Sequence, residues 1–354
     1  MTDEANSSGD ALRDQLYALP KIELHRHLEG SLRLETLSEI ARTHNVGLPQ
    51  DIEALRPHVQ IVDSDLGDLR HFLSKFDALR RFYRSPEIVE RVTREAIADC
   101  AADNIKYLEL RFTPRALAAT MNFPLEDVSA WVVDATERAA QEFGVEVRLI
   151  ISMNRHESVK LGEEVARIAV DHLGNGVVGL DLAGNEASFP ATPFAPIFHE
   201  AKQAGLKITV HAGEWSGADS VREAIEHIGA DRLGHGVRIV QDSSVVRIAR
   251  ERKIAFEVCV TSNLQSGSIK HLEQHPLKKL HHLSLLTTIN TDDPSVSDIT
   301  LTDELVVVTN DLGLTLDDVK TNILNAVRVA FLPDAERAKL AAQFREDLDS
   351  DTNR

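Results

Sequence analysis

The chain has 354 residues, with 39 Lys and Arg against 56 Asp and Glu, and a formal net charge of −17. This acidic balance without a basic cluster argues against nucleic acid or an anionic membrane surface as the main partner. No stretch has the apolar length of a membrane span, and the polar opening MTDEANSSGDALRDQL lacks the apolar core of a secretory signal, so we expect a cytoplasmic protein. Cys100 and Cys259 are the only cysteines, and we expect both to be buried free thiols.

Eight short apolar runs bounded by polar or turn residues are the candidate strands. In chain order they cover residues 21–27, 105–112, 146–153, 177–184, 207–214, 231–239, 255–262 and 287–294. Segments of helical period lie between most of them, for example 85–104, 125–144 and 196–205. This alternation predicts a single domain over residues 1–354, an α/β (β/α)8 TIM-type barrel. An open doubly wound sheet would usually carry a glycine-rich turn after its first strand, where this chain has HRHLEGS.

Residues 51–87, before the second strand, are too long for a simple crossover and predict a helical insertion after strand 1. Such an insertion would hang over the barrel mouth. Its apolar members Leu69, Phe72, Leu73 and Phe76 follow helical spacing, so they are candidates for a lid, with plain packing onto the barrel as the alternative. The C-terminal segments 300–312 and 324–344 predict extra helices, and residues 1–15 are expected to be frayed.

The candidate metal ligands lie at the ends of these strands. His25 and His27 are two residues apart on a strand, so both side chains point to one face. His211 and Asp292 end the fifth and eighth strands, and the strand ends of a parallel barrel meet at one mouth. Three imidazoles and one carboxylate suit Zn²⁺ or a similar ion, with a water in the open position.

Other polar residues stand beside this set. Glu214 follows His211 by three residues and is not needed as a ligand, so it is available for proton transfer. His235, flanked by two glycines, and Asp293 could orient and deprotonate the metal-bound water. Gly184 ends the fourth strand and offers its backbone N–H to a flat heterocycle. The remaining histidines, such as His156, His199, His275 and His281, are expected to be surface or packing residues.

The motifs LPKIELHRHLEGSLR, VVGLDLAGNE, HAGE, GHG, TSN and NTDDP resemble the adenosine deaminase family of metal-dependent amidohydrolase-type barrels, most closely its bacterial members. The resemblance runs in order from Leu19 to Pro333. It implies one Zn²⁺ per subunit and hydroxide attack on purine C6 with loss of ammonia. The ligands it implies are His25, His27, His211 and Asp292.

The resemblance also implies roles for the neighbouring residues. Glu214 would protonate ring N1, and His235 and Asp293 would position the hydroxide. Asp293 would also contact N7, and the Gly184 backbone N–H would contact N3. His27 and Glu29 would complete the substrate site for a small purine nucleoside.

Glu29 departs from the family pattern. Typical members have Asp at this position, where it contacts the ribose 5′-hydroxyl, and HLEG is similar to relatives that act on adenine or aminofutalosine-type nucleosides. TSNLQSGS and NTDDPSVSDITLTDE, however, resemble bacterial adenosine deaminases. We therefore predict adenosine, with deoxyadenosine, as substrate. Adenine, aminofutalosine or another 6-aminopurine nucleoside is the alternative.

Two other classes are disfavoured. A catalytically silent barrel that only binds metal or nucleoside would have no use for Glu214 and Asp293 beside the ligands. A barrel hydrolase of amides or phosphoesters often uses two metals bridged by a modified lysine, and no Lys ends a predicted mid-barrel strand.

Overall fold

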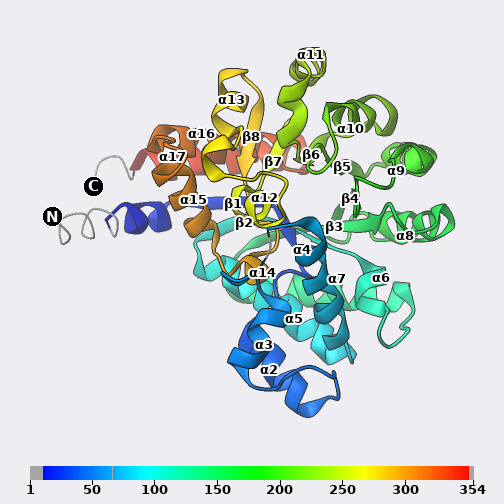
Figure 1. Cartoon of the computed structure of the whole chain (residues 1–354). Coiled ribbons are helices and arrows are strands. Elements are labelled where there is room, and N and C mark those ends of the chain that lie inside the picture. Colours follow the sequence, from blue (N-terminus) through cyan, green and yellow to red (C-terminus); the bar gives the residue numbers. More distant parts are fainter. Residues whose placement is uncertain (1–10, 66, 351–354) are drawn as a thin grey trace.

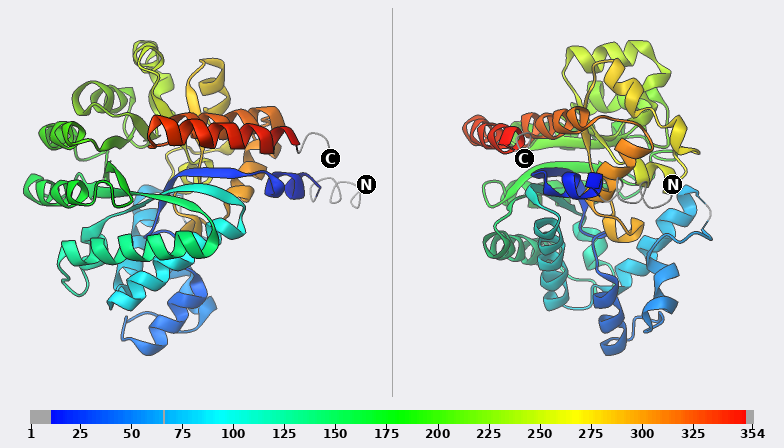
Figure 2. Two further views of the ribbon diagram at one scale, coloured as in Figure 1. Left: turned by 180° about the vertical axis from the view of Figure 1, so that it is seen from behind. Right: turned by 90° about the vertical axis from the view of Figure 1, so that its left-hand side faces the viewer.

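The computed structural model describes residues 11–65 and 67–350 and forms an eight-stranded parallel sheet that curls into a barrel with helices on its outside (Figures 1 and 2). Each strand pairs with the next one in chain order, which confirms the predicted fold. The strands are β1 (Lys21–His27), β2 (Ile105–Phe112), β3 (Glu146–Asn154), β4 (Val177–Ala183), β5 (Lys207–Ala212), β6 (Arg232–His235), β7 (Ala255–Val258) and β8 (Leu286–Ile289).

The barrel closes between β8 and β1 through two residues that follow β8. The Asn290 side chain accepts a hydrogen bond from the backbone N–H of Leu24 at 2.9 Å. Asp292 pairs with β1 on both sides of Arg26: its N–H donates to His25 O at 3.0 Å, and its carbonyl accepts from His27 N at 2.8 Å. The segment that closes the barrel therefore also carries one of the predicted metal ligands.

The strand β2 shows how the sequence divides the two faces of the sheet. Glu109 and Arg111 alternate with Leu108 and Leu110, and all four are fully buried. Because successive strand residues face opposite sides, the charged pair points into the barrel and the leucines point to the helices. Charged side chains thus fill part of an interior where branched apolar residues usually dominate.

The covering helices are amphipathic, and several begin at a capping residue that the sequence supplies. Ser85 accepts a hydrogen bond from Ile88 N at the start of α5, where Pro86 fits the first turn. The helices outside the strands are α5 (Pro86–Ala102), α6 (Pro114–Ala118), α7 (Leu125–Phe143), α8 (Val159–Asp171), α9 (Ala195–Ala204), α10 (Ala218–Glu223), α11 (Ser243–Glu251), α12 (Val260–Gln265), α13 (Leu277–His282), α14 (Pro294–Ser297), α15 (Leu301–Asn310), α16 (Leu316–Val329) and α17 (Asp334–Ser350).

The insertion after β1 is helical, as predicted, and comprises α2 (Leu34–Thr43), α3 (Ile52–Val59) and α4 (Leu69–Leu79). In Figure 1, α2 and α3 lie at the edge of the molecule and α4 lies close to the strands. Asp68 caps α4 by accepting from His71 N at 2.8 Å. The extra C-terminal helices α15, α16 and α17 are also present.

The last three strands are shorter than the sequence pattern predicts. β6 ends at His235, α12 begins at Val260, and β8 ends at Ile289, whereas the predicted strands extend to residues 239, 262 and 294. The chain turns at these points: His235 and Asp292 have φ of 59° and 67°. An extended strand cannot include a residue with positive φ. The turns at the barrel mouth therefore end β6 at His235 and keep the segment after β8 from continuing as a strand.

Two further predictions concern the N-terminus and membranes. Of the segment 1–15, expected to be frayed, residues 1–10 lie outside the described residues, whereas residues 11–18 are helical and Leu16 is fully buried. Among the described residues, no helix is long and apolar enough to cross a membrane. Cys100 and Cys259 are buried free thiols, as predicted.

Candidate metal and active site

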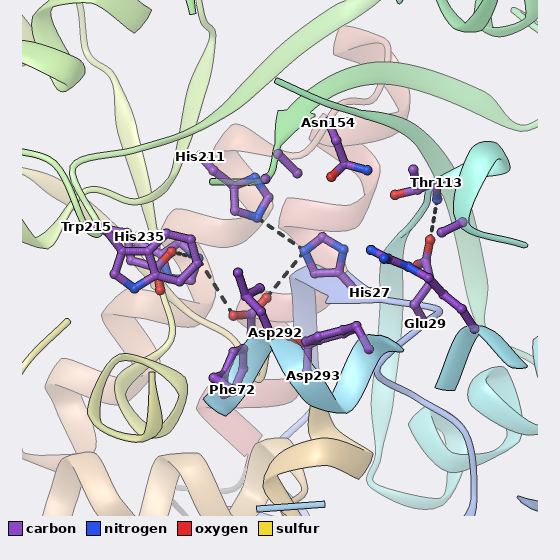
Figure 3. Close-up of a pocket in the computed structure, with 17 residues that line it drawn as sticks. His27, Glu29, Phe72, Thr113, Asn154, His211, Trp215, His235, Asp292 and Asp293 are labelled. Carbon is purple, nitrogen blue, oxygen red and sulfur yellow. Dashed lines mark hydrogen bonds and ion pairs between the residues drawn. The ribbon is translucent and has the colours of Figure 1, made fainter. Parts of the chain in front are cut away.

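The carboxyl ends of the strands surround a pocket of about 680 Å³ of open space (Figure 3). The sequence-predicted site residues that line it are His27, Glu29, Gly184, His211, Glu214, His235, Asp292 and Asp293, together with Phe72, Leu73 and Phe76 of α4. Two predicted residues do not line it. His25 lies fully buried in the ligand cluster, and Leu69 faces elsewhere.

The four predicted ligands converge although they come from three separate parts of the chain. One ligand atom each from His25, His27, His211 and Asp292 lies within 4.8 Å of the others. His27 Nε2 is 3.2 Å from His211 Nε2 and 3.4 Å from Asp292 Oδ1, as Figure 3 shows. His25 Nε2 is 3.1 Å from the same Asp292 oxygen. The structure thus brings together the set that the sequence predicts.

Buried carboxylates orient two of these imidazoles. His25 Nδ1 is 2.7 Å from Glu257 Oε2, and His211 Nδ1 is 3.1 Å from Asp181 Oδ1. A carboxylate only accepts, so each Nδ1 carries the proton and each Nε2 offers a lone pair to the centre. The hydroxyl of Ser262 donates to the remaining Asp292 oxygen at 2.7 Å.

Sequence reasoning missed these orienting residues. Glu257 also pairs with Arg111 at 2.8 Å and with Arg232 at 2.6 Å, all of them buried inside the barrel. Burial opposes ionisation, but the two arginines hold the pKa of Glu257 well below its usual range, and His211 and Arg111 do the same for the pKa of Asp181. The available signal was a charged residue within each short apolar strand β2, β4 and β7.

Close packing at the mouth requires glycine at two positions. A Cβ on Gly30 would lie 2.0 Å from Asp293 Oδ1, and a Cβ on Gly234 would lie 2.7 Å from His25 Cε1. Neither position can therefore take a side chain without displacing a site residue.

Glu214 is a buried carboxyl next to the ligand cluster. Its Oε2 is 3.5 Å from His235 Nε2, and its Oε1 accepts from Ser266 Oγ at 3.3 Å. Burial, together with the nearby Asp292 and Glu186 carboxylates, raises the pKa of Glu214 well above its usual value. The raised pKa favours the protonated form that a general acid needs.

Glu186 holds the turn that presents Glu214, and sequence reasoning missed it. Its buried carboxylate accepts hydrogen bonds from the backbone N–H groups of Glu214, Trp215 and Ser216 at 3.0, 2.9 and 3.2 Å, and from Gly213 N as well. Arg155 donates to the carbonyl of His211 in the same turn. The signal was a carboxylate two residues after Gly184, close to a strand end.

Asp293 and Glu29 are further buried carboxyls of the pocket. Burial and the neighbouring Asp292 and Glu29 raise the pKa of Asp293 well above its usual value, and burial raises the pKa of Glu29 to about 7. Glu29 Oε1 accepts from Thr113 N at 2.6 Å, whereas its Oε2 has no hydrogen-bond partner. Figure 3 places Glu29 and Thr113 on the opposite side of His27 from His235 and Trp215.

His275, expected to be a surface or packing residue, is buried and connected to the site. Its Nε2 is 3.3 Å from Asn263 Oδ1, and Asn263 Nδ2 is 3.0 Å from His235 Nδ1. No local sequence pattern indicates this link, because the three residues come from separate parts of the chain. Arg80, Thr113, Asn154 and Trp215 are other pocket residues that sequence reasoning missed.

Comparisons with known proteins agree with this geometry. The family model described as "Adenosine deaminase" matches residues 20–347. An adenosine deaminase of Klebsiella pneumoniae is 37% identical over 324 residues, which cover 91% of this chain and 97% of the relative.

Two solved structures share the fold over nearly the whole chain. An adenine deaminase from Arthrobacter aurescens has a TM-score of 0.85 and 26% identity, covering 94% of this chain and 99% of its own. An amidohydrolase from Burkholderia ambifaria with bound Zn has a TM-score of 0.87 and 26% identity, covering 97% and 95%.

Proposed function

This chain belongs to the adenosine deaminase family, and on that premise we propose that it is a zinc-dependent enzyme that hydrolyses adenosine, and deoxyadenosine, to the 6-oxopurine nucleoside and ammonia. The observation that carries the proposal is the convergence of three imidazoles and Asp292 at the floor of a pocket in which Glu214 stands beside His235. The 37% identity to a named adenosine deaminase over 97% of that relative favours adenosine as substrate.

The donor set fits a single zinc ion. Four ligands at the usual Zn–N and Zn–O distances around a tetrahedral ion lie about 3.3 Å apart. Three of the six separations among these ligand atoms, 3.1, 3.2 and 3.4 Å, agree with this value, and all six lie within 4.8 Å.

The residues around this centre have separate roles in the reaction. A bound Zn²⁺ would lower the pKa of its water to about 7 and so supply a nucleophile at neutral pH. Glu214 donates its proton to purine N1, which makes C6 more electrophilic. His235 and Asp293 position the oxygen that attacks C6. The purine amino group takes the proton that this oxygen loses and leaves as ammonia. Asp293 also contacts N7, and the Gly184 backbone N–H contacts N3.

Glu29 is the proposed ribose contact. Thr113 occupies one of its carboxyl oxygens, and the other is free to bond the 5′-hydroxyl. A site that bonds a hydroxyl discriminates strongly against its loss, because the buried carboxyl is then left without a partner. We therefore expect kcat/KM for adenosine to exceed that for adenine and for 5′-deoxyadenosine by at least ~10-fold.

Absorbance assays for loss of the 6-amino group across adenine, adenosine, deoxyadenosine, 5′-deoxyadenosine and aminofutalosine test the substrate. Adenine is the second candidate, because the Arthrobacter adenine deaminase shares the fold at 26% identity. Equal or better turnover of adenine would establish that candidate. A preference for aminofutalosine would assign the enzyme to 5′-extended nucleosides.

Elemental analysis tests the metal content. We expect one equivalent of a transition metal per chain, because the cluster offers four well-placed ligands for one ion. Active protein without metal, or with two required equivalents, would contradict the site.

We further propose that α4 serves as the lid. Leu73 and Phe76 are partly buried and line the pocket, so they both pack on the core and face the substrate. Leu73→Ala should raise KM. The free-energy equivalent of that rise should exceed the loss in the free energy of unfolding. Loss of stability with unchanged KM would assign α4 to packing alone.

A further inference from the structure

Two buried side chains connect His235 to the protein on the side away from the ligand cluster. Asn263 Nδ2 lies 3.0 Å from His235 Nδ1, and Asn263 Oδ1 lies 3.3 Å from His275 Nε2. The other ring nitrogen of His275 accepts from the backbone N–H of Leu277 at 3.2 Å. All three side chains are buried, His275 with 7% of its surface exposed.

The backbone N–H of Leu277, at the end of this series, determines the donor and the acceptor in each of its hydrogen bonds. A backbone N–H can only donate, so His275 Nδ1 must be the accepting nitrogen. A neutral imidazole then carries its proton on Nε2, and burial lowers the pKa of His275 to about 4, which keeps the ring neutral. His275 Nε2–H therefore needs an acceptor, and the Asn263 carbonyl oxygen provides it.

The amide of Asn263 is fixed as a result. With its oxygen toward His275, its NH₂ group faces His235 Nδ1, which must accept. A flipped amide would set two donors against each other at His275. The Asn263 backbone is also held, since its N–H donates to Cys259 O at 2.9 Å and its carbonyl accepts from Ile269 N at 2.9 Å.

We propose that Asn263 and His275 are positioning residues that keep the proton of His235 on Nε2. His235 Nε2 faces Glu214 Oε2 and Asp292 Oδ2 at 3.5 and 3.7 Å, and the ionised Asp292 offers an acceptor to a proton there. In the reaction, His235 then acts as a hydrogen-bond donor that orients the attacking oxygen. This role rests on the proposed deaminase function, whereas the tautomer itself does not.

The tautomer can be observed directly in the full chain. In metal-loaded protein with ¹⁵N-labelled histidine, with the His235 signals identified by their loss in His235→Asn, we expect Nε2 to be protonated and Nδ1 to be unprotonated. Asn263→Asp places an acceptor-only group at Nδ1, so the proton should move from Nε2 to Nδ1. We expect kcat of this variant to fall ~100-fold or more, with KM within ~3-fold of the original value.

A second series of variants separates positioning from general damage. His275→Leu removes the donor to Asn263 and should lower kcat by ~10-fold. His275→Gln can still donate to Asn263 and accept from Leu277, so it should recover most of that loss. His281→Leu is the matched control, because His281 lies six residues after His275, on α13, but bonds Thr287 and Asn322 and does not line the pocket. Its kcat should be unchanged.

Three results would overturn the inference: a proton on Nδ1 of His235 in the original protein, no change of tautomer in Asn263→Asp, or equal losses in His275→Leu and His281→Leu. If Asn263→Asp does not fold, the comparison of His275→Leu with His275→Gln decides. Failure of the original protein to deaminate any purine would reject the proposed function, and the spectra would still test the tautomer.

Discussion

Two groups of buried carboxyls in this barrel respond to burial in opposite ways. In the interior, Glu257 and Asp181 are fully buried, and neighbouring arginine and histidine side chains hold their pKa well below the usual range. At the mouth, Glu214 and Asp293 are almost as buried; burial raises their pKa, and the nearby carboxylates raise it further. Burial opposes ionisation in both groups, and the neighbouring charges decide whether that effect is overcome.

The two groups of carboxyls therefore have different roles, one structural and one chemical. The interior network satisfies its own charges and fixes the orientation of His25 and His211. The mouth holds Glu214 and Asp293 in surroundings that favour their protonated forms, whereas Asp292 beside the imidazoles stays ionised and can serve a cation. The predictions below test the mouth and the interior separately.

The largest effect is expected from His211→Ala. The remaining His25, His27 and Asp292 hold zinc poorly, so metal and turnover should be lost together. Metal content per chain and kcat are measured on the same sample. His199→Ala, an exposed histidine of α9, is the control and should keep both. A His211→Ala protein that retains one equivalent of metal would contradict the ligand set.

Arg232→Met tests the interior. Arg232 bonds both Glu109 and Glu257, and its loss leaves these buried carboxylates without that partner. Breaking a buried ion pair in this way costs about 3–5 kcal/mol of unfolding free energy, measured by denaturant titration. Arg148→Met is the matched control at the surface, where Arg148 pairs with Glu146 and Glu336, and should cost about 1 kcal/mol or less. Similar losses in both variants would show that the interior network has no special role.

Glu214→Gln tests the mouth without removing a ligand. The variant should keep its metal and its stability, while kcat falls ~100-fold or more, because the amide cannot protonate N1. Glu200→Gln, an exposed residue of α9, is the control. Normal turnover in Glu214→Gln with metal present would reject the role as acid.

The smallest effect concerns Glu304, a buried carboxyl outside the pocket that bonds Thr261. Burial raises its pKa to about 7, so between about pH 4.5 and 7 the folded protein binds this proton more tightly than the unfolded chain. Stability from this group is therefore present at low pH and lost as pH rises to about 7.

Glu304→Gln should remove that loss, an effect of at most about 3 kcal/mol. The free energy of unfolding measured at pH 5 and pH 8 should differ less in the variant than in the original protein. An equal pH dependence in both would show that Glu304 does not carry this shift. Glu200→Gln again serves as the control, since its exposed carboxyl should not alter the pH dependence.

Local patterns were enough to predict the main features of the fold and the candidate residues of the site. The boundaries of β1 and β2 match the predicted runs 21–27 and 105–112, because their apolar residues and flanking polar residues are local signals. The spacing of His25 and His27 placed both on one strand face. A histidine or carboxylate at the end of a strand also points to the mouth of a barrel, whatever the rest of the chain does.

The contacts that hold those residues in place could not be predicted from local patterns. Glu257 and His25 are 232 positions apart, and Glu186 binds a turn 27 to 30 positions downstream, so no local pattern connects them. Asp292 closes the barrel with a positive φ that no strand pattern predicts. Strands of four residues, such as β6 and β8, are too short to show a period. The physical reason is common to all: these contacts form only when the ends of eight strands meet.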